Sequence, residues 1–283
     1  VLLTWLFVRI TKQDPSITLL GICPYSKLKE WIRVIDTEDR GGVRICTLNR
    51  PEALNAFNNE QFDLVAEAFL NAQKDSGVRV LVLTGAGRAF SAGADLSDGG
   101  RDAEVKYGFG GMAHIIAEFS KPFVVAVNGL GVGVGATICG LADFAFMSEG
   151  ARLRCPFSTL GLVAEAGSTR TFPALMGRQQ AAWMLMSSEW MSSSQCKEMG
   201  LILEVFPDEL FMEKVVEKAS HLASMPPDSL AAAKRLINGP EIQHIKAVID
   251  AENTELEKLR GGPANIEAVT AFREKRDPDF SSL

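Results

Sequence analysis

Two apolar runs, each followed directly by a turn rich in small residues, most strongly constrain the fold of this chain. The first run covers residues 80–83 and leads through a glycine-rich turn to the segment 91–95, Ser-Ala-Gly-Ala-Asp. The second covers 123–127, about forty residues later, and leads into the glycine-rich segment 128–135. Runs of branched apolar residues favour buried strands, and glycine permits conformations and close approaches that other residues avoid. The spacing predicts an α/β protein with repeated ββα units.

The periodicity of the other segments predicts the remaining elements. Alternating apolar residues predict a hairpin of strands over 31–36 and 43–48, joined at Gly41-Gly42. Helices are expected over 59–74, 103–119 and, buried, 136–141, with further strands over 143–147 and 151–155. From about residue 178 the pattern is mainly helical, and helices are expected over 179–186, 208–224, 228–237, 241–260 and 264–273. The helix over 228–237 has Asp228 as its cap and Asn238-Gly239-Pro240 as its stop. A further helix is capped by Ser192-Ser193-Ser194 and ended by Gly200.

Composition and charge exclude several classes of partner. The 283 residues carry a net charge of −6 without a long basic run, so nucleic acid is not an expected partner. The apolar run 1–8 is too short to span a bilayer, which takes roughly 20 residues. Residues 1–30 are expected to form a poorly ordered arm. The three histidines are isolated and the five cysteines are widely spaced, so we expect no metal site and interpret the cysteines as reduced packing residues.

Common nucleotide and hydrolase motifs do not fit the chain. The segment 128–135 has a spacing similar to GxGxxG, but it lies in the middle of the chain, whereas dinucleotide-binding folds place this motif after the first strand. The sequence contains neither a P-loop GKS or GKT nor a GxSxG elbow. Nucleotide hydrolysis and serine hydrolysis of that type are therefore disfavoured.

Glu165 is an acid within a loop, 159–168, of otherwise apolar and small residues. Removing a carboxylate from water raises its proton affinity, which suits a general base. The alternative is that Glu165 lies at a helix N-terminus, where acids are favoured. Asp95 has the same alternative, as the cap or first-turn acid of a helix.

Five motifs occur along the chain in one recognisable order. They are 48–57 (Leu-Asn-Arg-Pro-Glu-Ala-Leu-Asn-Ala-Phe), 83–95, 121–143, 156–162 and 225–230 (Met-Pro-Pro-Asp-Ser-Leu). With them, the chain resembles the crotonase, or enoyl-CoA hydratase/isomerase, superfamily from about residue 31 to residue 280. The resemblance implies the crotonase fold, a spiral core of ββα units over 31–204. It also implies a C-terminal helical region over 205–283 that packs between the subunits of a homotrimer or a dimer of trimers.

The resemblance also implies a site for an acyl-CoA thioester. Backbone N–H groups of Ala92 and Val134 would bind the thioester oxygen and stabilise the enolate that forms when carbon 2 loses a proton. Family members often have glycine where this chain has Val134, but the contact is made through the backbone. Coenzyme A is part of the substrate, so no separate cofactor is expected. The residues expected to bind substrate are Asn55, Ala56, Phe57, Ser91, Ala92, Gly93, Ala94, Asp95 and Gly133.

The acids of the site favour one reaction of the superfamily. Hydratases typically use two glutamates around a water molecule, and the position that matches the first of them is Thr137, which has no carboxyl group. Glu165 matches the glutamate of peroxisomal-type isomerases. One base suffices to carry a proton from carbon 2 to carbon 4, so we expect Δ3-Δ2-enoyl-CoA isomerisation in fatty-acid β-oxidation, with Glu165 as the catalytic base. The alternatives are hydration, thioester hydrolysis or, without catalysis, an acyl-CoA-binding scaffold.

The last three residues, Ser281-Ser282-Leu283, resemble the peroxisomal address Ser-Lys-Leu without its basic residue. The expected location is therefore the peroxisome, with the mitochondrion as the alternative. The sequence leaves the acyl-chain length of the substrate open.

Overall fold

The computed structural model describes residues 34–95, 105–281 and 283. The chain divides into two units, Val1–Val34 and Ile35–Leu283, and the described helices and strands belong to the second. Some predictions lie outside the described residues: the arm 1–30, residues 31–33 of the first strand, and residues 103–104 of the helix expected over 103–119. Residues 105–107 are described and are not helical, so that helix begins later than predicted, at Gly108. Ser282 of the C-terminal tripeptide lies outside them as well, and the peroxisomal location stays a prediction.

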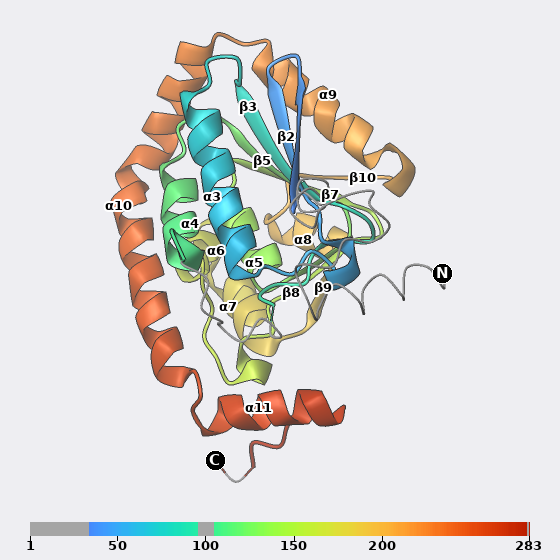
Figure 1. Cartoon of the computed structure of the whole chain (residues 1–283), viewed down its shortest axis with the longest axis vertical. Helices are drawn as coiled ribbons and strands as arrows, with labels where there is room; N and C mark the ends of the chain where they lie inside the picture. Colours follow the sequence, from blue (N-terminus) through green and yellow to red (C-terminus); the bar gives the residue numbers. More distant parts are fainter. Residues whose placement is uncertain (1–33, 96–104, 282) are drawn as a thin grey trace, which may run out of the picture. The chain divides into compact units, whose positions relative to one another are not determined.

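A six-stranded sheet holds the first strands of the repeated units (Figure 1). β1 pairs antiparallel with β2, and all other neighbours in this sheet are parallel. The hairpin is thus confirmed, although its first strand begins at Ile35 and pairs there with Leu48. In spatial order the strands are β1 (Ile35–Arg40), β2 (Val43–Leu48), β3 (Val80–Gly85), β5 (Phe123–Val127), β7 (Phe144–Ser148) and β10 (Glu204–Phe206).

A second, four-stranded sheet collects the strands that follow. Its order is β4 (Ala89–Ser91), β6 (Leu130–Val132), β8 (Arg152–Arg154) and β9 (Trp190–Ser192). The helices α3 (Asn59–Lys74), α4 (Gly108–Glu118), α5 (Val134–Thr137) and α6 (Ser168–Met176) follow β2, β4, β6 and β8 along the chain. The prediction of repeated ββα units is confirmed, and the predicted bounds of α3 and β5 match the structure.

The two faces of the six-stranded sheet bury different cores. Along β3, Val80 and Val82 belong to the core beneath helix α9 (Phe211–Ala223), whereas Leu81 and Leu83 belong to the core that α3 and α4 cover. This alternation follows from the two-residue period of a strand. Phe62, Val65 and Phe69 form the buried face of α3. The ends of β4 and β6 that lead into the glycine-rich turns lie on the side of the six-stranded sheet that α3 covers, because Phe90 and Val134 belong to the core beneath α3.

The C-terminal half differs most from its prediction. Helix α10 (Pro227–Leu259) continues for 33 residues through Pro240, so the stop at Asn238-Gly239-Pro240 and the cap at Asp228 are wrong, and Pro226 precedes the helix instead. A proline inside a helix costs about 3 kcal/mol, and packing can offset such a cost. Lys234 Nζ donates to a carboxylate oxygen of Asp143 at 2.6 Å, and Asn238 Nδ2 donates to the other at 2.9 Å. These bonds hold the helix just before the proline.

The remaining helices agree with the sequence pattern more closely. Ser192 caps α8 through a capping box and Gly200 ends the helix, as predicted. The segment predicted as a buried helix over 136–141 is α5 followed by a 3-10 turn, Ile138–Leu141. The other bounds are α7 (Arg178–Ser187), α8 (Ser193–Met199), α11 (Pro263–Glu274) and the 3-10 turns Pro51–Ala53, Ser158–Leu160 and Asp208–Leu210.

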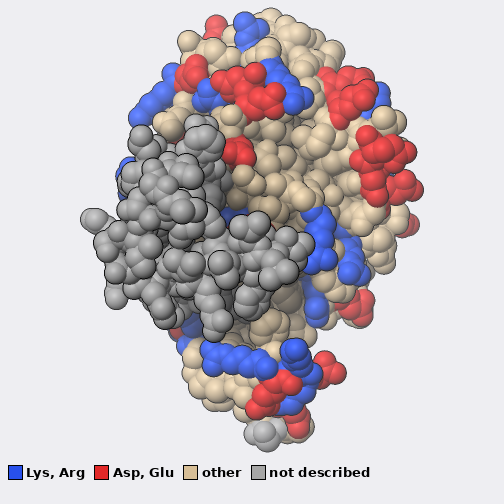
Figure 2. Space-filling model, turned by 45° about the vertical axis from the view of Figure 1, so that its right-hand side comes forward, with Lys and Arg blue, Asp and Glu red and all other residues tan. Residues whose placement is uncertain are grey.

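Within the described residues, no helix has the length and apolar character needed to cross a membrane. On the face shown in Figure 2, both acidic and basic side chains lie among the other residues. Cys46, Cys139, Cys155 and Cys196 are free and buried, in agreement with their interpretation as packing residues.

Candidate active site

The two glycine-rich turns come together at the ends of two neighbouring strands. β4 and β6 run parallel, and Ser91 pairs with Gly131. Gly93 has φ +87°, and a Cβ atom there would lie 2.8 Å from the carbonyl oxygen of Val132. Only glycine fits such a close approach. Three residues beyond the Ser91–Gly131 pair, the two chains reach Ala94 and Val134, so these two residues are the counterparts at the turn.

The N–H of Ala92 already has an acceptor, since it donates to the carbonyl oxygen of Leu54 at 2.9 Å. In this structure the N–H predicted as an oxyanion donor at Ala92 is therefore occupied by a backbone bond. Phe57 N donates to Gly93 O at 2.7 Å and Asp95 N donates to Phe57 O at 2.8 Å, which leaves the N–H of Ala94, between them, directed away from Phe57. Within the described part of the chain, no acceptor is recorded for this N–H. Among the described residues, the N–H of the first turn that is left for a ligand is thus that of Ala94.

Val134 carries the corresponding backbone N–H of the second turn. It is the first residue of α5, and the first N–H groups of a helix have no acceptor within the helix. Gly133, with φ +55°, turns the chain into α5. The side chain of Val134 is 4% exposed and packs in the core, so the isopropyl group in place of the family's frequent glycine does not occupy the turn. The backbone N–H remains available to a ligand.

The segment 54–57 supports the first turn from behind. Asn55 is fully buried with φ +56°, and its Nδ2 donates to Ala86 O and Ala89 O at 2.9 and 2.8 Å. Ser91 Oγ donates to Asn55 O at 2.9 Å, and the ring of Phe57 stacks on that of Phe62. The side chains of Asn55, Phe57 and Ser91 therefore hold the loop, and none of these three residues is more than 2% exposed.

Arg50, which was not among the predicted site residues, joins the segment 54–57 to the end of the segment 91–95. Its Nη1 donates to Ala56 O at 2.6 Å, and its Nη2 pairs with Asp95 at 3.0 Å. Both side chains of this ion pair are largely buried, at 19% and 13% exposure. Arg50 belongs to the motif 48–57, but its partner follows 45 residues later, so only the fold brings the two together.

Glu165 lies in the loop before α6 and is 7% exposed. Thr137 Oγ1 donates to its Oε1 at 2.6 Å. Burial raises the pKa of Glu165 to about 8, the bond from Thr137 opposes this rise, and the charge of Glu252 adds to it. α6 begins at Ser168 after Gly167, so Glu165 precedes the helix and is not a first-turn acid. The structure thus agrees with a desolvated carboxylate.

Two successive left-handed residues shape the chain directly after Glu165. Ala166 has φ +61° and Gly167 has φ +70°. A non-glycine residue in this region costs roughly 1–3 kcal/mol and persists only where its surroundings enforce it. Ala166 is 2% exposed, so the conformation is fixed by packing. The loop holds the carboxylate of Glu165 in one position opposite Thr137.

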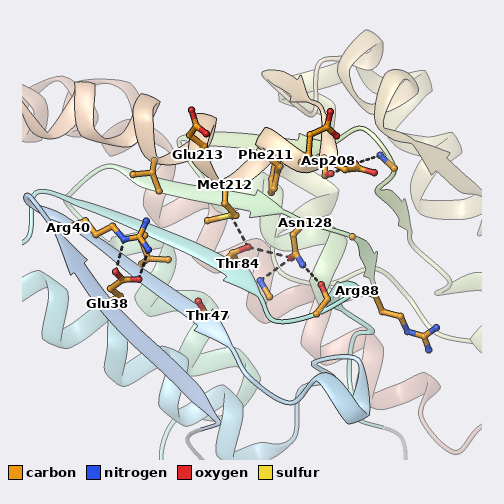
Figure 3. A pocket seen from close by; sticks show the side chains of 18 residues that line it. Glu38, Arg40, Thr47, Thr84, Arg88, Asn128, Asp208, Phe211, Met212 and Glu213 are labelled. Atoms are coloured by element: carbon orange, nitrogen blue, oxygen red, sulfur yellow. Dashed lines mark hydrogen bonds and ion pairs between the residues drawn. The ribbon is translucent and has the colours of Figure 1, made fainter.

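A cavity of about 710 Å³ lies elsewhere, between α9 and strands β1 to β3 (Figure 3). Glu38 and Arg40 pair with each other at its rim, and Thr84 and Asn128 lie below Met212 (Figure 3). Ala94, Val134 and Glu165 do not line it. Thr84 Oγ1 already donates to Ala126 O at 2.9 Å and Asn128 Nδ2 to Gly87 O at 3.0 Å, so these polar groups serve the fold.

Comparison with known proteins identifies the family. The family model described as enoyl-CoA hydratase/isomerase matches residues 38–282. The chain is 35% identical to the 1,2-epoxyphenylacetyl-CoA isomerase of Escherichia coli (strain K12), over 85% of this chain and 95% of that protein. It is 34% identical to enoyl-CoA delta isomerase 2 of Rattus norvegicus, over 82% of this chain and 61% of that protein, so it spans about three fifths of this relative.

A solved structure supports the same conclusion. The crystal structure of an enoyl-CoA hydratase/isomerase from Pseudoalteromonas atlantica T6c superposes with a TM-score of 0.83, at 31% identity, over 88% of this chain and all of that chain. The parallel sheets and helices described above are those of the crotonase fold, as expected from the motifs. By sequence and by fold, this chain is an enzyme of the enoyl-CoA hydratase/isomerase family.

Proposed function

We propose that this enzyme converts 3-enoyl-CoA thioesters into 2-enoyl-CoA thioesters, with Glu165 as its catalytic base. The observation that carries the proposal is the pairing of a buried carboxylate with a hydroxyl: Thr137 Oγ1 donates to Glu165 at 2.6 Å where a hydratase of the superfamily would need a second acid. The pKa of about 8 suits a group that must both take up and release a proton near neutral pH.

The proposed reaction uses two groups of contacts. The thioester oxygen accepts hydrogen bonds from the N–H groups of Ala94 and Val134, each worth on the order of 3 kcal/mol at the developing charge. Glu165 removes a proton from carbon 2, and the electrons of the broken C–H bond spread into a dienolate over the thioester and the double bond. The protonated Glu165 then returns the proton to carbon 4, and the double bond ends between carbons 2 and 3.

Hydration is disfavoured by the same contact. Addition of water needs a base to activate the water and an acid to deliver a proton. Thr137 has no ionisable carboxyl, and its hydroxyl has two acceptors within hydrogen-bond distance, Glu165 Oε1 at 2.6 Å and Gly133 O at 3.2 Å. A single carboxylate therefore supports proton transfer within the substrate better than addition of water.

A second candidate is the isomerisation for which the Escherichia coli relative is named. This chain covers 95% of that protein at 35% identity, against 61% of the rat delta isomerase at 34%. Both candidates act on an acyl-CoA thioester, and they differ in the acyl group and in the bonds that are rearranged. Substrates of both kinds therefore belong in the activity test.

We further propose that the C-terminal helices contact other subunits in a trimer. Several large apolar side chains on α10 and α11 face solvent in the single chain. Leu236 and Ile237 are 76% and 74% exposed, and Ile266 and Phe272 are 58% and 69% exposed. Isolated exposed apolar residues are common, so the proposal depends on their occurrence on both helices. Sedimentation of the full chain tests it, and a clean monomer would contradict it.

The test of function is a panel of 3-enoyl, 2-enoyl and epoxyphenylacetyl thioesters, assayed with the wild type, Glu165→Gln and the control Glu198→Gln, which changes an exposed acid of α8. We expect isomerisation of 3-enoyl substrates to exceed hydration of 2-enoyl substrates. Glu165→Gln should lower isomerisation by roughly 10²- to 10⁴-fold, and the control should not. Undiminished isomerisation in Glu165→Gln, or rapid hydration by the wild type, would overturn the proposal.

A further inference from the structure

The second half of α10 packs directly against the loop that carries Glu165. A Cβ atom on Gly167 would lie 3.2 Å from Cγ2 of Ile245 and 3.4 Å from Cγ1 of Ile249. Ile249 is fully buried. The loop after Glu165 is therefore closed on one side by a helix that begins sixty residues later in the chain, at Pro227.

Glu252, one turn further along α10, binds the same loop through both of its carboxylate oxygens. Oε2 accepts from Gly167 N at 2.6 Å, and Oε1 accepts from Thr169 N at 2.9 Å and from Thr169 Oγ1 at 2.6 Å. The residue is 5% exposed. These donors lie at the start of α6, where N–H groups lack intrahelical partners and negative charge is favoured. Glu252 thus caps α6 from another helix.

We propose, on the basis of the proposed function of Glu165, that Glu252 is a positioning residue for this base. By holding Gly167 and Thr169, it fixes the left-handed turn at Ala166 and Gly167 that directs the carboxylate of Glu165 toward Thr137. It also places a second negative charge beside the base. Glu252 acts through the loop and through its field, and it does not touch the substrate.

The groups that face Glu165 come from three parts of the fold. Thr137 from α5 donates a hydrogen bond, Cys155 follows β8, and Glu252 belongs to α10. Burial raises the pKa of the Cys155 thiol well above its usual range, so this side chain stays neutral. Burial raises the pKa of Glu252 as well, while the hydrogen bonds from Thr169 and Gly167 favour its ionised form. The charge of ionised Glu252 raises the pKa of Glu165 in addition to the effect of burial. Removing this charge should therefore lower the pKa of Glu165.

Two substitutions of Glu252 distinguish its effect on the position of the Glu165 loop from the effect of its charge. Glu252→Gln removes the charge and turns an amide NH2 toward one of the loop donors, so both functions are affected. Glu252→Asp keeps the charge but shortens the reach by one methylene. Glu257→Gln is the matched control, since it changes an exposed acid on the same helix. Thermal unfolding of each variant reports whether the fold is retained.

The first measurement needs no substrate. The protein is labelled with ¹³C at the glutamate carboxyls, Glu165→Gln identifies the resonance of Glu165, and this resonance is titrated in each variant. We expect its pKa to fall in Glu252→Gln and to stay near the wild-type value in Glu252→Asp and Glu257→Gln. A loss of helix capping alone would not lower this pKa, because a loosened loop weakens the bond from Thr137 that opposes its rise. An unchanged titration in Glu252→Gln would overturn the electrostatic part of the proposal.

The second measurement is kinetic. With a 3-enoyl substrate we expect kcat to fall about 10- to 100-fold in both Glu252 variants, with KM within about 3-fold of the wild type, because a misplaced base slows the chemical step. Wild-type kcat in both variants would overturn the positioning role, and if Glu252→Gln does not fold, Glu252→Asp decides. Absence of isomerisation in the wild type would refute the proposed function, while the titration would still decide the role of Glu252.

Discussion

Thr137 Oγ1 donates a 2.6 Å hydrogen bond to Oε1 of Glu165, and both side chains are buried, at 0% and 7% exposure. The hydroxyl stabilises the ionised carboxylate, whereas the loss of water destabilises it. Burial is the larger effect, so the pKa of Glu165 lies at about 8. The base of the proposed reaction therefore titrates within the range in which enzyme assays are run.

This pKa predicts the pH dependence of the reaction. Glu165 must be ionised to accept a proton, so kcat/KM with a 3-enoyl thioester should rise with pH up to about 8 and then level off. The measurement is a pH–rate profile from pH 5.5 to roughly 9.5, because kcat/KM reports groups of the free enzyme. A profile that is flat across pH 6 to 9 would contradict a base of this pKa.

Removing the hydroxyl of Thr137 should make Glu165 harder to ionise. Thr137→Val keeps the shape of the side chain but deletes the donor that lowers the pKa of Glu165. The rise in kcat/KM should then occur at higher pH, and kcat/KM at pH 7 should fall about tenfold if the midpoint moves up by about one pH unit. Thr137→Ser keeps the hydroxyl and should retain the wild-type profile. A midpoint at lower pH in Thr137→Val would refute the assigned contact.

The raised pKa also has a consequence for stability. Because the folded protein binds this proton more tightly than the unfolded chain, Glu165 costs no stability below its ordinary pKa of 4.5, and the cost grows as the pH rises to about 8. Glu165→Gln removes the buried charge and should be more stable than the wild type at pH 8.5, by up to a few kcal/mol, with the difference vanishing toward pH 4. Denaturant unfolding at several pH values measures this, and a gap that widens at low pH would contradict it.

The sequence predicted those parts of the fold that depend on local pattern. The bounds of α3 and β5 and the caps of α8 follow from periodicity and capping residues nearby in the chain. The helix break at Asn238-Gly239-Pro240 was wrong because anchors at Asp143, about a hundred residues earlier, outweigh the local preference. Packing of this kind cannot be read from a local pattern.

In the candidate site, too, some residues follow from a local sequence pattern and others depend on distant partners. Glu165 could be predicted because it is an acid among apolar and small residues, whereas Arg50 and Glu252 could not, since their partners lie 45 and 83 to 85 positions away. The motif alone points to Ala92, but the backbone bond from Ala92 N to Leu54 O decides which N–H of the turn is left for a ligand. Hydrogen bonds of the backbone decide this assignment, and side-chain identity carries no signal for it.

The ion pair between Arg50 and Asp95 should control substrate affinity. It joins the segments 50–57 and 91–95, which the family resemblance places along coenzyme A. Arg50→Met removes this ion pair and the hydrogen bond to Ala56 O, so it should loosen the contact between the two segments and raise KM for the thioester about tenfold, with a smaller change in kcat. Lys214→Met, which breaks an exposed pair on α9, is the control. A double-mutant cycle with Asp95→Asn measures the coupling, and additive effects would show that the pair does not act as a unit.

The assignment of the first oxyanion donor can be tested at the level of a single N–H group. Replacing Ala94 by its α-hydroxy acid exchanges the N–H for an ester oxygen and keeps the side chain. If Ala94 N–H binds the thioester oxygen, this change should lower kcat by roughly 10²- to 10³-fold. The same exchange at Ala92 removes the bond to Leu54 and should cost about 1 kcal/mol of stability while kcat stays within about 3-fold. Unfolding curves of both variants serve as the control, because the ester at Ala94 also weakens the carbonyl of Gly93 that accepts from Phe57. The opposite pattern, with catalysis lost at Ala92 and retained at Ala94, would return the donor role to Ala92.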